Sequence, residues 1–433
     1  MIVAQQLSKF VSNSVPDATS AGAERIMRLS LFDWATCGMA GVDEPVSRIV
    51  RGTALAQGVQ GQSPIFGGDG SGLPPAMAAL VNGTTSHALD YDDTHFAHIG
   101  HPSVTVIPAA MAVRQPGHSD TDVLWAALIG AEVSVRVGLW LGRSHYQAGF
   151  HQTATAGAFG ATAAAGLLLG LTELQMQTAL GFAATQAAGL KSQFGTMGKP
   201  YHAGLAARTG VEAAYLAKAG FDTRGEGIDG PQGFGPTHEG EANASAFEGM
   251  GTAWQMETVS HKFHACCHGL HAMLDGLATL DAPAQSIERI DIMTHPRWLS
   301  VCNIAEPSTG LETKFSFRHA AALCVSGYKT SALSSFTDAL AQDDVLKDIR
   351  KHVSVRTDDT LPETEAEVTV VTDRSAATAR GNLSAPLGID TRTDRLRDKA
   401  RSLLGDEVEE VLWLVTHDKR APDLDALSKL MML

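Results

Sequence analysis

The sequence of 433 residues is short of cysteine and of positive charge. Five cysteines are few for this length and their number is odd, which favours a reduced compartment over a disulfide framework, so a cytoplasmic location is expected. Lys and Arg number 33 against 47 Asp and Glu, giving a formal net charge of −14. This balance argues against nucleic acid or an anionic membrane surface as a partner.

Several signals of common protein classes are also missing. A basic start followed by an apolar run is absent, so no signal peptide is predicted. The longest charge-free stretch, 152–172, consists mostly of Ala, Gly and Thr, and it is predicted to be a buried helix rather than a membrane span. The glycine-rich segment FGGDGSGLPP lacks the lysine of a phosphate-binding loop and the spacing of a dinucleotide fingerprint, and is interpreted as a turn.

Helical periodicity fills the first two thirds of the chain, as in AGAERIMRLSLFDWATCGMAG and TDVLWAALIGAEVSVRVGLWLG. The texture changes near residue 285, where SIERIDIMTH and later EAEVTVVTD alternate as half-buried strands do. The predicted fold is mainly α. It has a large all-helical domain over 1–270, to which a helical segment at about 400–433 returns, and a smaller α+β domain over 271–399.

The stretch HALDYDDTHFAHIGHPS, residues 87–103, carries three aspartates and four histidines. His95, His98 and His101 recur every three residues beside Asp92 and Asp93, and these are ligand types for zinc, iron or manganese. The proline after His101 disfavours a continuing helix, and the spacing matches no familiar zinc motif. A site for acid/base chemistry is therefore favoured over a metal site or a solvated helix end.

Three further clusters carry candidate groups. Tyr146 and His151 precede the charge-free helix, whose unpaired amides suit a substrate carboxylate. Lys199 lies between glycines and before a proline, so it is expected outside a regular helix, where it can hold a carboxylate or donate a proton. The segment SHKFHACCHGLHAMLDG offers Lys262 as an anion contact, and its adjacent cysteines are interpreted as helix packing rather than as zinc ligands.

Six ordered motifs resemble those of the MmgE/PrpD family: AALVNGTTSHALDYDDTH, HPSVTVIPAAMA, GFHQTATAGAFGATAAAGLLLGL, MGKPYHAGLAARTGVEAAYLAKAGF, GPQGFG and HKFHACCHGLHAMLDGL. That family includes 2-methylcitrate dehydratase, cis-aconitate decarboxylase and iminodisuccinate epimerase, and this sequence is most similar to the last. The resemblance implies an all-helical domain, an α+β lid, a homodimer, and neither a metal nor an organic cofactor.

The resemblance also assigns residues by position. The substrate-binding positions that match the family's motifs, besides Lys199, are Asp90, Thr94, His101, His151 and Lys262. One departure is Ala265, which stands where the family often has a proline.

The family's reactions occur at a carbon next to a carboxylate, and inversion of that carbon needs one proton carrier on each face. Tyr146 and Lys199 are predicted to be this catalytic pair. Free Tyr and Lys titrate near pH 10, so burial or a neighbouring charge must tune them.

The predicted function is a cofactor-independent epimerase of iminodisuccinate or a similar small anionic dicarboxylate. The alternatives are a dehydratase of a 2-methylcitrate-like hydroxy acid, a metal-dependent hydrolase using Asp92, Asp93 and the histidines, and a catalytically inactive dimeric binding protein.

Overall fold

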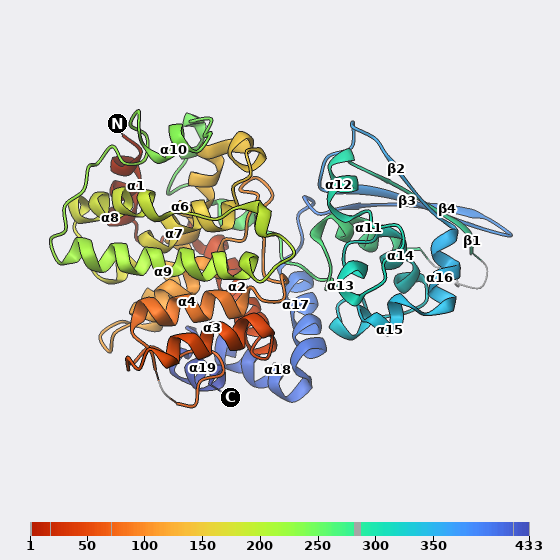
Figure 1. Cartoon of the computed structure of the whole chain (residues 1–433), viewed down its shortest axis with the longest axis horizontal. Helices are drawn as coiled ribbons and strands as arrows, with labels where there is room; N and C mark the ends of the chain where they lie inside the picture. Colours follow the sequence, from red (N-terminus) through yellow and green to blue (C-terminus); the bar gives the residue numbers. More distant parts are fainter. Residues whose placement is uncertain (1, 18, 71, 281–286, 419, 433) are drawn as a thin grey trace. The chain divides into compact units, whose positions relative to one another are not determined.

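The computed structural model describes residues 2–17, 19–70, 72–280, 287–418 and 420–432, and the protein is mainly α with a smaller α+β part (Figure 1). The chain forms two compact units, Met1–His261 with Asp406–Leu433, and Lys262–Gly405. The domain limits predicted from the sequence, at residues 270 and 399, stay predictions.

The described helices of the first unit are α1 (Val3–Asn13), α2 (Ala21–Ala40), α3 (Pro45–Ala56), α4 (Pro75–Ser86), α5 (Ser103–Val113), α6 (Asp120–Gln147), α7 (Gln152–Leu168), α8 (Glu173–Gln186), α9 (Gly198–Lys218), α10 (Phe234–Thr237), α18 (Asp406–Trp413) and α19 (Leu424–Met431). Short 3₁₀ turns η1 (Lys191–Gln193), η2 (Ala244–Phe247) and η3 (Gln255–Thr258) and a π-turn η8 (Leu414–Asp418) connect them.

Helix α7 lies at the centre of this unit and packs against both α6 and α9, while α9 also packs against α4 (Figure 1). Small residues allow this close packing. A Cβ added at Gly204 of α9 would lie 2.2 Å from the carbonyl oxygen of Leu80 in α4, and one at Gly160 of α7 would lie 2.5 Å from the carbonyl oxygen of Gly130 in α6. The Ala- and Gly-rich composition thus sets the distance between the helices that carry the site.

The charge-free stretch forms a buried helix, as the sequence predicts. Every residue of α7 except Leu167 is buried. Helix α6 is long and apolar enough to cross a membrane by length and composition, but 89% of its most apolar window is buried inside the protein. Burial of this kind is typical of a core helix.

The second unit contains a four-stranded sheet in the order β2-β1-β3-β4, in which β1 pairs with β2 in parallel and with β3 antiparallel. Helix α11 packs against β3 and β4. The described elements are η4 (His268–Leu270), α11 (His271–Leu277), β1 (Ile287–Thr294), η6 (Pro296–Trp298), α12 (Leu299–Cys302), α13 (Gly310–Thr313), α14 (Phe317–Val325), η7 (Leu333–Ser335), α15 (Asp338–Ala341), α16 (Asp344–Lys351), β2 (Val353–Thr357), β3 (Glu365–Thr372), β4 (Ala376–Asn382) and α17 (Ile389–Leu404).

The two predicted strands are confirmed as β1 and β3, although Ser286 lies outside the described residues. Between these strands, the segment 336–353 contains two helices, α15 and α16. The Asp343 carboxylate accepts from the Leu346 amide and starts the second of them, and Val353 belongs to β2.

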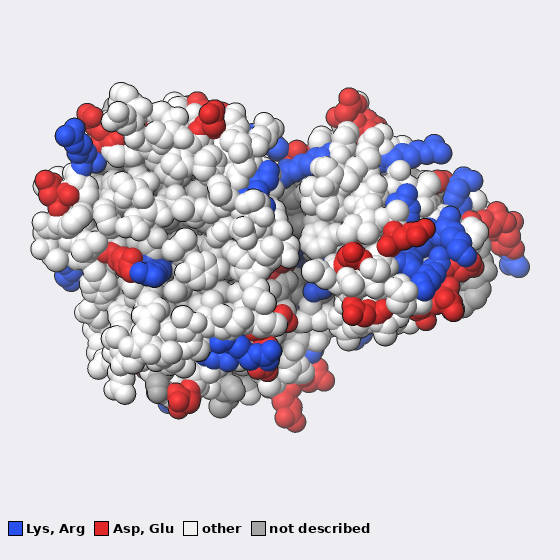
Figure 2. Space-filling model, viewed as in Figure 1, with Lys and Arg blue, Asp and Glu red and all other residues white. Residues whose placement is uncertain are grey.

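The last helices complete the first unit. The Gly67 amide donates to the Met431 carbonyl over 2.8 Å, and the Arg28 guanidinium donates to the Thr416 carbonyl over 2.5 Å. On the face shown in Figure 2, the first unit is largely uncharged, whereas Lys, Arg, Asp and Glu side chains lie intermixed over the second unit. This face therefore carries no large patch of a single sign of charge.

Candidate functional site

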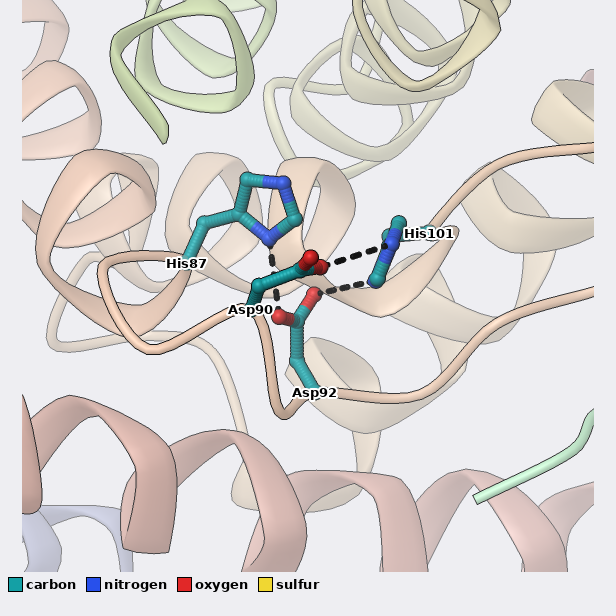
Figure 3. Close-up of side chains that lie close together, drawn as sticks. All are labelled: His87, Asp90, Asp92 and His101. Atoms are coloured by element: carbon teal, nitrogen blue, oxygen red, sulfur yellow. Dashed lines mark hydrogen bonds and ion pairs between the residues drawn. The ribbon is translucent and has the colours of Figure 1, made fainter. Parts of the chain in front are cut away.

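The loop between α4 and α5 carries the histidine- and aspartate-rich stretch. Helix α4 ends at Ser86, so His87 caps its C-terminus. Asp90 has φ of +51°, in the left-handed region that aspartate tolerates better than most residues. The chain turns sharply there, and the carboxylates of Asp90 and Asp92 both lie between the imidazoles of His87 and His101, as Figure 3 shows.

Backbone pairing holds this loop in place. The Thr94 amide donates to the Ser260 carbonyl over 2.8 Å, and the Ser260 amide donates back to the Thr94 carbonyl over 2.7 Å. At the other end, the Ser103 hydroxyl donates to Asp93 over 2.5 Å at the start of α5. The loop is therefore anchored on both sides of the histidines.

Asp92 joins two buried imidazoles. Its Oδ1 accepts from His87 Nδ1 over 2.8 Å, and its Oδ2 lies 3.0 Å from His101 Nδ1 (Figure 3). The Asp92 side chain is only 2% exposed. The His87 and His101 rings meet edge to face, with centroids 4.5 Å apart.

Lys199 completes this cluster. Its Nζ lies 2.5 Å from Asp90 Oδ1, and the same oxygen lies 3.4 Å from His101 Nε2. The expectation that Lys199 lies outside a regular helix is wrong, because it belongs to the first turn of α9. A proline is tolerated in a first turn, where the backbone amide needs no partner within the helix.

His151 lies immediately before α7 and is 2% exposed. Its Nδ1 is 3.3 Å from Nδ1 of His202, a residue of α9, and its ring stacks near that of His87 with centroids 6.3 Å apart. The ring of Phe194 meets it edge on. The structure thus brings together Asp90, His101, His151 and Lys199 of the predicted set.

Burial and charge decide the protonation states of these groups. Burial lowers the pKa of His101, with Asp92 opposing, and lowers the pKa of His151 still further below its ordinary value, with Lys199 acting in the same direction. Burial alone would raise the pKa of Asp92, but the two imidazoles outweigh it and hold that pKa well below its usual range. The site at neutral pH therefore combines an ionised Asp92 with neutral imidazoles of His101 and His151.

Tyr146 lies in the last turn of α6 rather than in a loop before α7. Helix α6 consists of two helical segments joined by a kink at Gly142, whose φ of +69° lies in the left-handed region that glycine adopts readily. The lysine beside Tyr146 is Lys191, whose Nζ lies 3.8 Å above the tyrosine ring and donates to the Tyr146 carbonyl over 2.9 Å. The contacts of Lys199 join it to Asp90 instead, and the catalytic pairing of Tyr146 with Lys199 stays a prediction.

Two further predicted residues, Thr94 and Lys262, are connected to Ser260, the first by backbone pairing and the second along the chain. Thr94 pairs with Ser260 through its backbone, and Lys262 is buried and begins the second unit two residues later. Their predicted roles as substrate contacts stay predictions. The cysteines near Lys262 were expected in a helix, but they precede η4. Burial raises the pKa of the Cys266 thiol.

The cluster also has the composition of a metal site. One ligand atom from each of His87, Asp90, Asp92 and His101 lies within 4.8 Å of the others. The carboxylates, however, already face protein nitrogens, and the Lys199 ammonium supplies the positive charge that a metal ion would otherwise supply. The other histidines considered as ligands contact different partners: His95 Nε2 is 2.8 Å from Thr258 Oγ1, and His98 Nε2 is 3.5 Å from Ser134 Oγ.

An apolar hollow of about 410 Å³ lies between α3, α4 and the start of α9. Its wall includes Met197 and Tyr201, which flank Lys199 in sequence. Among the described residues that line it, none belongs to the predicted site set. The hollow is therefore separate from the polar cluster.

Sequence reasoning missed four side chains of this region: His87, Lys191, Phe194 and His202. Asp92 was weighed only as a metal ligand. His87 lies in the same histidine-rich stretch as Asp92, and the four residues between them allow a turn to bring the side chains together. The other three come from segments 191–202, where nothing in the local pattern distinguishes them from surface residues.

Comparison with known proteins fits this arrangement. Residues 5–246 match the MmgE/PrpD N-terminal domain and residues 264–413 match the MmgE/PrpD C-terminal domain. The chain is 27% identical to human cis-aconitate decarboxylase, over 93% of its own length and 88% of that enzyme's. It is 29% identical to cis-aconitate decarboxylase of Aspergillus terreus, over 64% of its own length and 60% of that enzyme's, and 26% identical to the mouse enzyme, over 85% and 81%. The two domain matches extend over most of the sequence, and the chain is an enzyme of the MmgE/PrpD family.

Proposed function

We propose that this protein is a cofactor-independent lyase that removes CO₂ or water from a small di- or tricarboxylic acid. The observation that carries the proposal is the cluster in which the half-buried Lys199 ammonium contacts Asp90 beside the buried, neutral imidazole of His101. The names of the relatives support it, because they are decarboxylases of an unsaturated tricarboxylic acid. They favour a lyase over the epimerase expected from the sequence.

The cluster suits this chemistry for electrostatic reasons. Breaking a bond at a carbon next to a carboxylate leaves an electron pair that spreads onto the carboxylate oxygens, and a nearby cation stabilises that charge. Lys199 is the cation of this group, and it is only 15% exposed, so water screens it little. The neutral imidazoles of His101 and His151 can take the proton that dehydration removes from carbon. Loss of CO₂ instead requires a proton at the carbon from which it leaves, and an imidazole that has first been protonated can supply it.

Epimerisation is a second candidate, because it uses the first half of the same chemistry. An epimerase needs proton carriers on two faces of one carbon, and the first unit offers two lysine-containing groups. One is Lys199 with Asp90, and the other is Lys191 with Tyr146. Iminodisuccinate remains the substrate that the sequence resemblance favours for this candidate. We also propose that the second unit acts as a lid and that the protein is a homodimer, which light scattering of the purified protein tests.

One assay separates the two reactions. The purified protein is incubated in deuterated water with cis-aconitate, with 2-methylcitrate and with single stereoisomers of iminodisuccinate. Release of CO₂, or formation of an alkene from the hydroxy acid, supports the lyase. Inversion of iminodisuccinate with deuterium at the α-carbon, without CO₂ or alkene, favours the epimerase. Absence of turnover with all three substrates contradicts the proposal, provided that the protein is folded by circular dichroism.

A further inference from the structure

Two buried imidazoles share a single carboxylate in the first unit. His87 Nδ1 lies 2.8 Å from one oxygen of Asp92, and His101 Nδ1 lies 3.0 Å from the other. The side chains of His87 and Asp92 are 0% and 2% exposed, so water does not compete for these contacts. The sequence analysis assigned no role to His87, and it weighed Asp92 only as a metal ligand.

The protonation pattern follows from the chemistry of the three groups. An ionised carboxylate only accepts hydrogen bonds, so His87 Nδ1, which is bonded to Asp92, carries a proton. Both nitrogens of His101 face carboxylate oxygens, Nδ1 that of Asp92 at 3.0 Å and Nε2 that of Asp90 at 3.4 Å. The proton of the neutral ring belongs on Nδ1, because Asp92 is the closer and more deeply buried carboxylate and Asp90 is already paired with the Lys199 ammonium. In a neutral imidazole the other nitrogen, Nε2, is then an acceptor. Asp92 is ionised and His101 is neutral, as the directions of their pKa values indicate. The carboxylate thus fixes which nitrogen of His101 can take a proton.

We propose that Asp92 and His87 are positioning residues that hold His101 with its Nε2 unprotonated and directed toward the Asp90–Lys199 pair. This inference rests on the proposed function, in that it takes the cluster to be the reaction site. His101 Nε2 lies 3.4 Å from Asp90 Oδ1, and the Lys199 ammonium contacts the same oxygen. His101 Nε2 would therefore accept a proton from the substrate in a fixed tautomer and a fixed ring orientation.

His87 contributes by holding the second oxygen of Asp92. The polar contact described for His87 is the one with Asp92, and its Nε2 is buried with no hydrogen-bond partner among the residues that the structure describes. Its ring also packs against that of His101. Without this donor, the free oxygen would let the Asp92 carboxylate rotate away from His101.

The adjacent carboxylate provides a matched contrast. Asp93 is as deeply buried as Asp92, but its Oδ2 accepts from the hydroxyls of Ser30 and Ser103 and its Oδ1 from the Ser103 amide, rather than from imidazoles. Burial raises the pKa of Asp93 to about 7. Substitution of Asp93 therefore tests the loss of a buried carboxylate without touching a histidine.

The central test is Asp92→Asn. The amide offers one acceptor and one donor, so one of the two imidazoles must adopt the opposite tautomer. We expect kcat to fall by roughly 10²- to 10³-fold with KM changed by less than about 3-fold, by analogy with a misoriented histidine in the Ser-His-Asp triad. Asp93→Asn should lower stability but leave kcat within about 3-fold of wild type, because the tautomer of His101 is unchanged.

A pH profile gives a readout that a merely structural role would not move. His101 faces titratable groups from its own loop, the end of α4, the start of α7 and α9, namely Asp90, Asp92, His87, His151 and Lys199. The Asp92 anion raises the pKa of His101, so Asp92→Asn should shift the acid limb of kcat/KM to lower pH. Asp93→Asn should leave that limb in place, and an unmoved limb in Asp92→Asn would overturn the inference.

His87 offers a conservative pair that keeps the test valid if Asp92→Asn does not fold. His87→Asn places an amide N–H near the position of Nδ1 and so retains the donor to Asp92, whereas His87→Phe removes it. We expect His87→Asn to keep activity within about 3-fold of wild type and His87→Phe to lose about 10-fold or more. Equal activity in both variants contradicts the role of His87.

Spectra of histidine-labelled protein separate failure of this inference from failure of the proposed function. Nitrogen-15 shifts of His87 and His101, assigned by substitution, report the tautomer and need no substrate. We expect the Nδ1-protonated form for both rings in wild type and a changed tautomer for one ring in Asp92→Asn. Wild-type protein inactive on every acid would contradict the proposed function, while an Nε2-protonated His101 would overturn the inference even in an active enzyme.

Discussion

Asp92 in the first unit and Asp275 in the second are carboxylates that each contact two nitrogen groups, and both come from histidine-rich segments. Asp92 contacts the imidazoles of His87 and His101. Asp275, a residue of α11, contacts His264 Nε2 over 3.2 Å and Arg395 Nη2 of α17 over 2.6 Å. Both carboxylates have pKa values below their usual range.

The two carboxylates differ in the groups that donate to them and in the contacts made by the other nitrogen of the histidine. A guanidinium such as that of Arg395 only donates hydrogen bonds, and the Nδ1 atom of His264 is 2.6 Å from the Thr330 hydroxyl. The Asp275 group therefore ties α11 to α17 and has no spare acceptor for a proton. The imidazole of His101, in contrast, presents Nε2 to a lysine–carboxylate pair. A carboxylate between two imidazoles can serve proton transfer, whereas one between an imidazole and a guanidinium serves to hold helices together.

The largest effect is expected at Lys199. Lys199→Met removes the cation beside Asp90 while keeping a side chain of similar length, and we expect turnover to fall by about 10³-fold because charge developing on the substrate loses its stabilisation. Steady-state kinetics on the productive substrate measure this. A rise in KM with unchanged kcat would show instead that Lys199 only binds the ground state.

Tyr146 comes next. If it carries a proton, Tyr146→Phe should lower turnover by about 10²-fold. Lys191→Met removes the ammonium that lies over the Tyr146 ring, and a loss of about 10-fold is expected through the tyrosine. Near-normal turnover in Tyr146→Phe would remove it from the reaction and leave the cluster around His101 as the source of proton carriers.

Asp275→Asn should have the opposite character to a change at Asp92. We expect it to lower the free energy of unfolding by roughly 1–3 kcal/mol, because Arg395 and His264 lose a charged acceptor, and to leave turnover within about 3-fold. Urea unfolding and the activity assay measure the two effects. A large loss of turnover at unchanged stability would mean that the second unit also carries reaction chemistry in this cluster.

The pH dependence of stability sharpens the same point. Burial alone would raise the pKa of Asp275, but His264 and Arg395 lower it to about 2. Since the folded-state pKa is depressed, the contribution to stability is present above the unfolded value of about 4 and is lost as pH falls toward 2. The stability difference between wild type and Asp275→Asn should therefore shrink over that interval, and a constant difference would contradict this account.

The smallest effect is expected from chelation. Because Lys199 and the imidazoles already contact the carboxylates of the cluster, dialysis against EDTA should leave turnover unchanged. Loss of activity that zinc restores would show that His87, Asp90, Asp92 and His101 bind a metal. Asp92 would then differ from Asp275 as a metal ligand rather than as a partner of two imidazoles.

Much of the helical architecture was predictable because its signals are local. Prolines before α4, the glycine that follows α2 and the small residues of α7 act within a few positions of the chain. Strand β4 was not predictable, because AATARGN shows no apolar alternation and is held in the sheet by pairing with β3. The position of Lys199 within a helix was predicted wrongly, since a proline disfavours a helix interior but not a first turn.

The sequence by itself determined the family, the mainly α architecture and the stretch from which most of the site is built. Its residue types already required pairing wherever they are buried, since burial of an unpaired charge is costly. Only the tertiary structure decided the pairs: Asp92 with two imidazoles, Lys199 with Asp90, and Lys191 with Tyr146. Pairing of this kind depends on how helices distant in sequence approach one another and on one left-handed turn at Asp90, and neither is written in local periodicity.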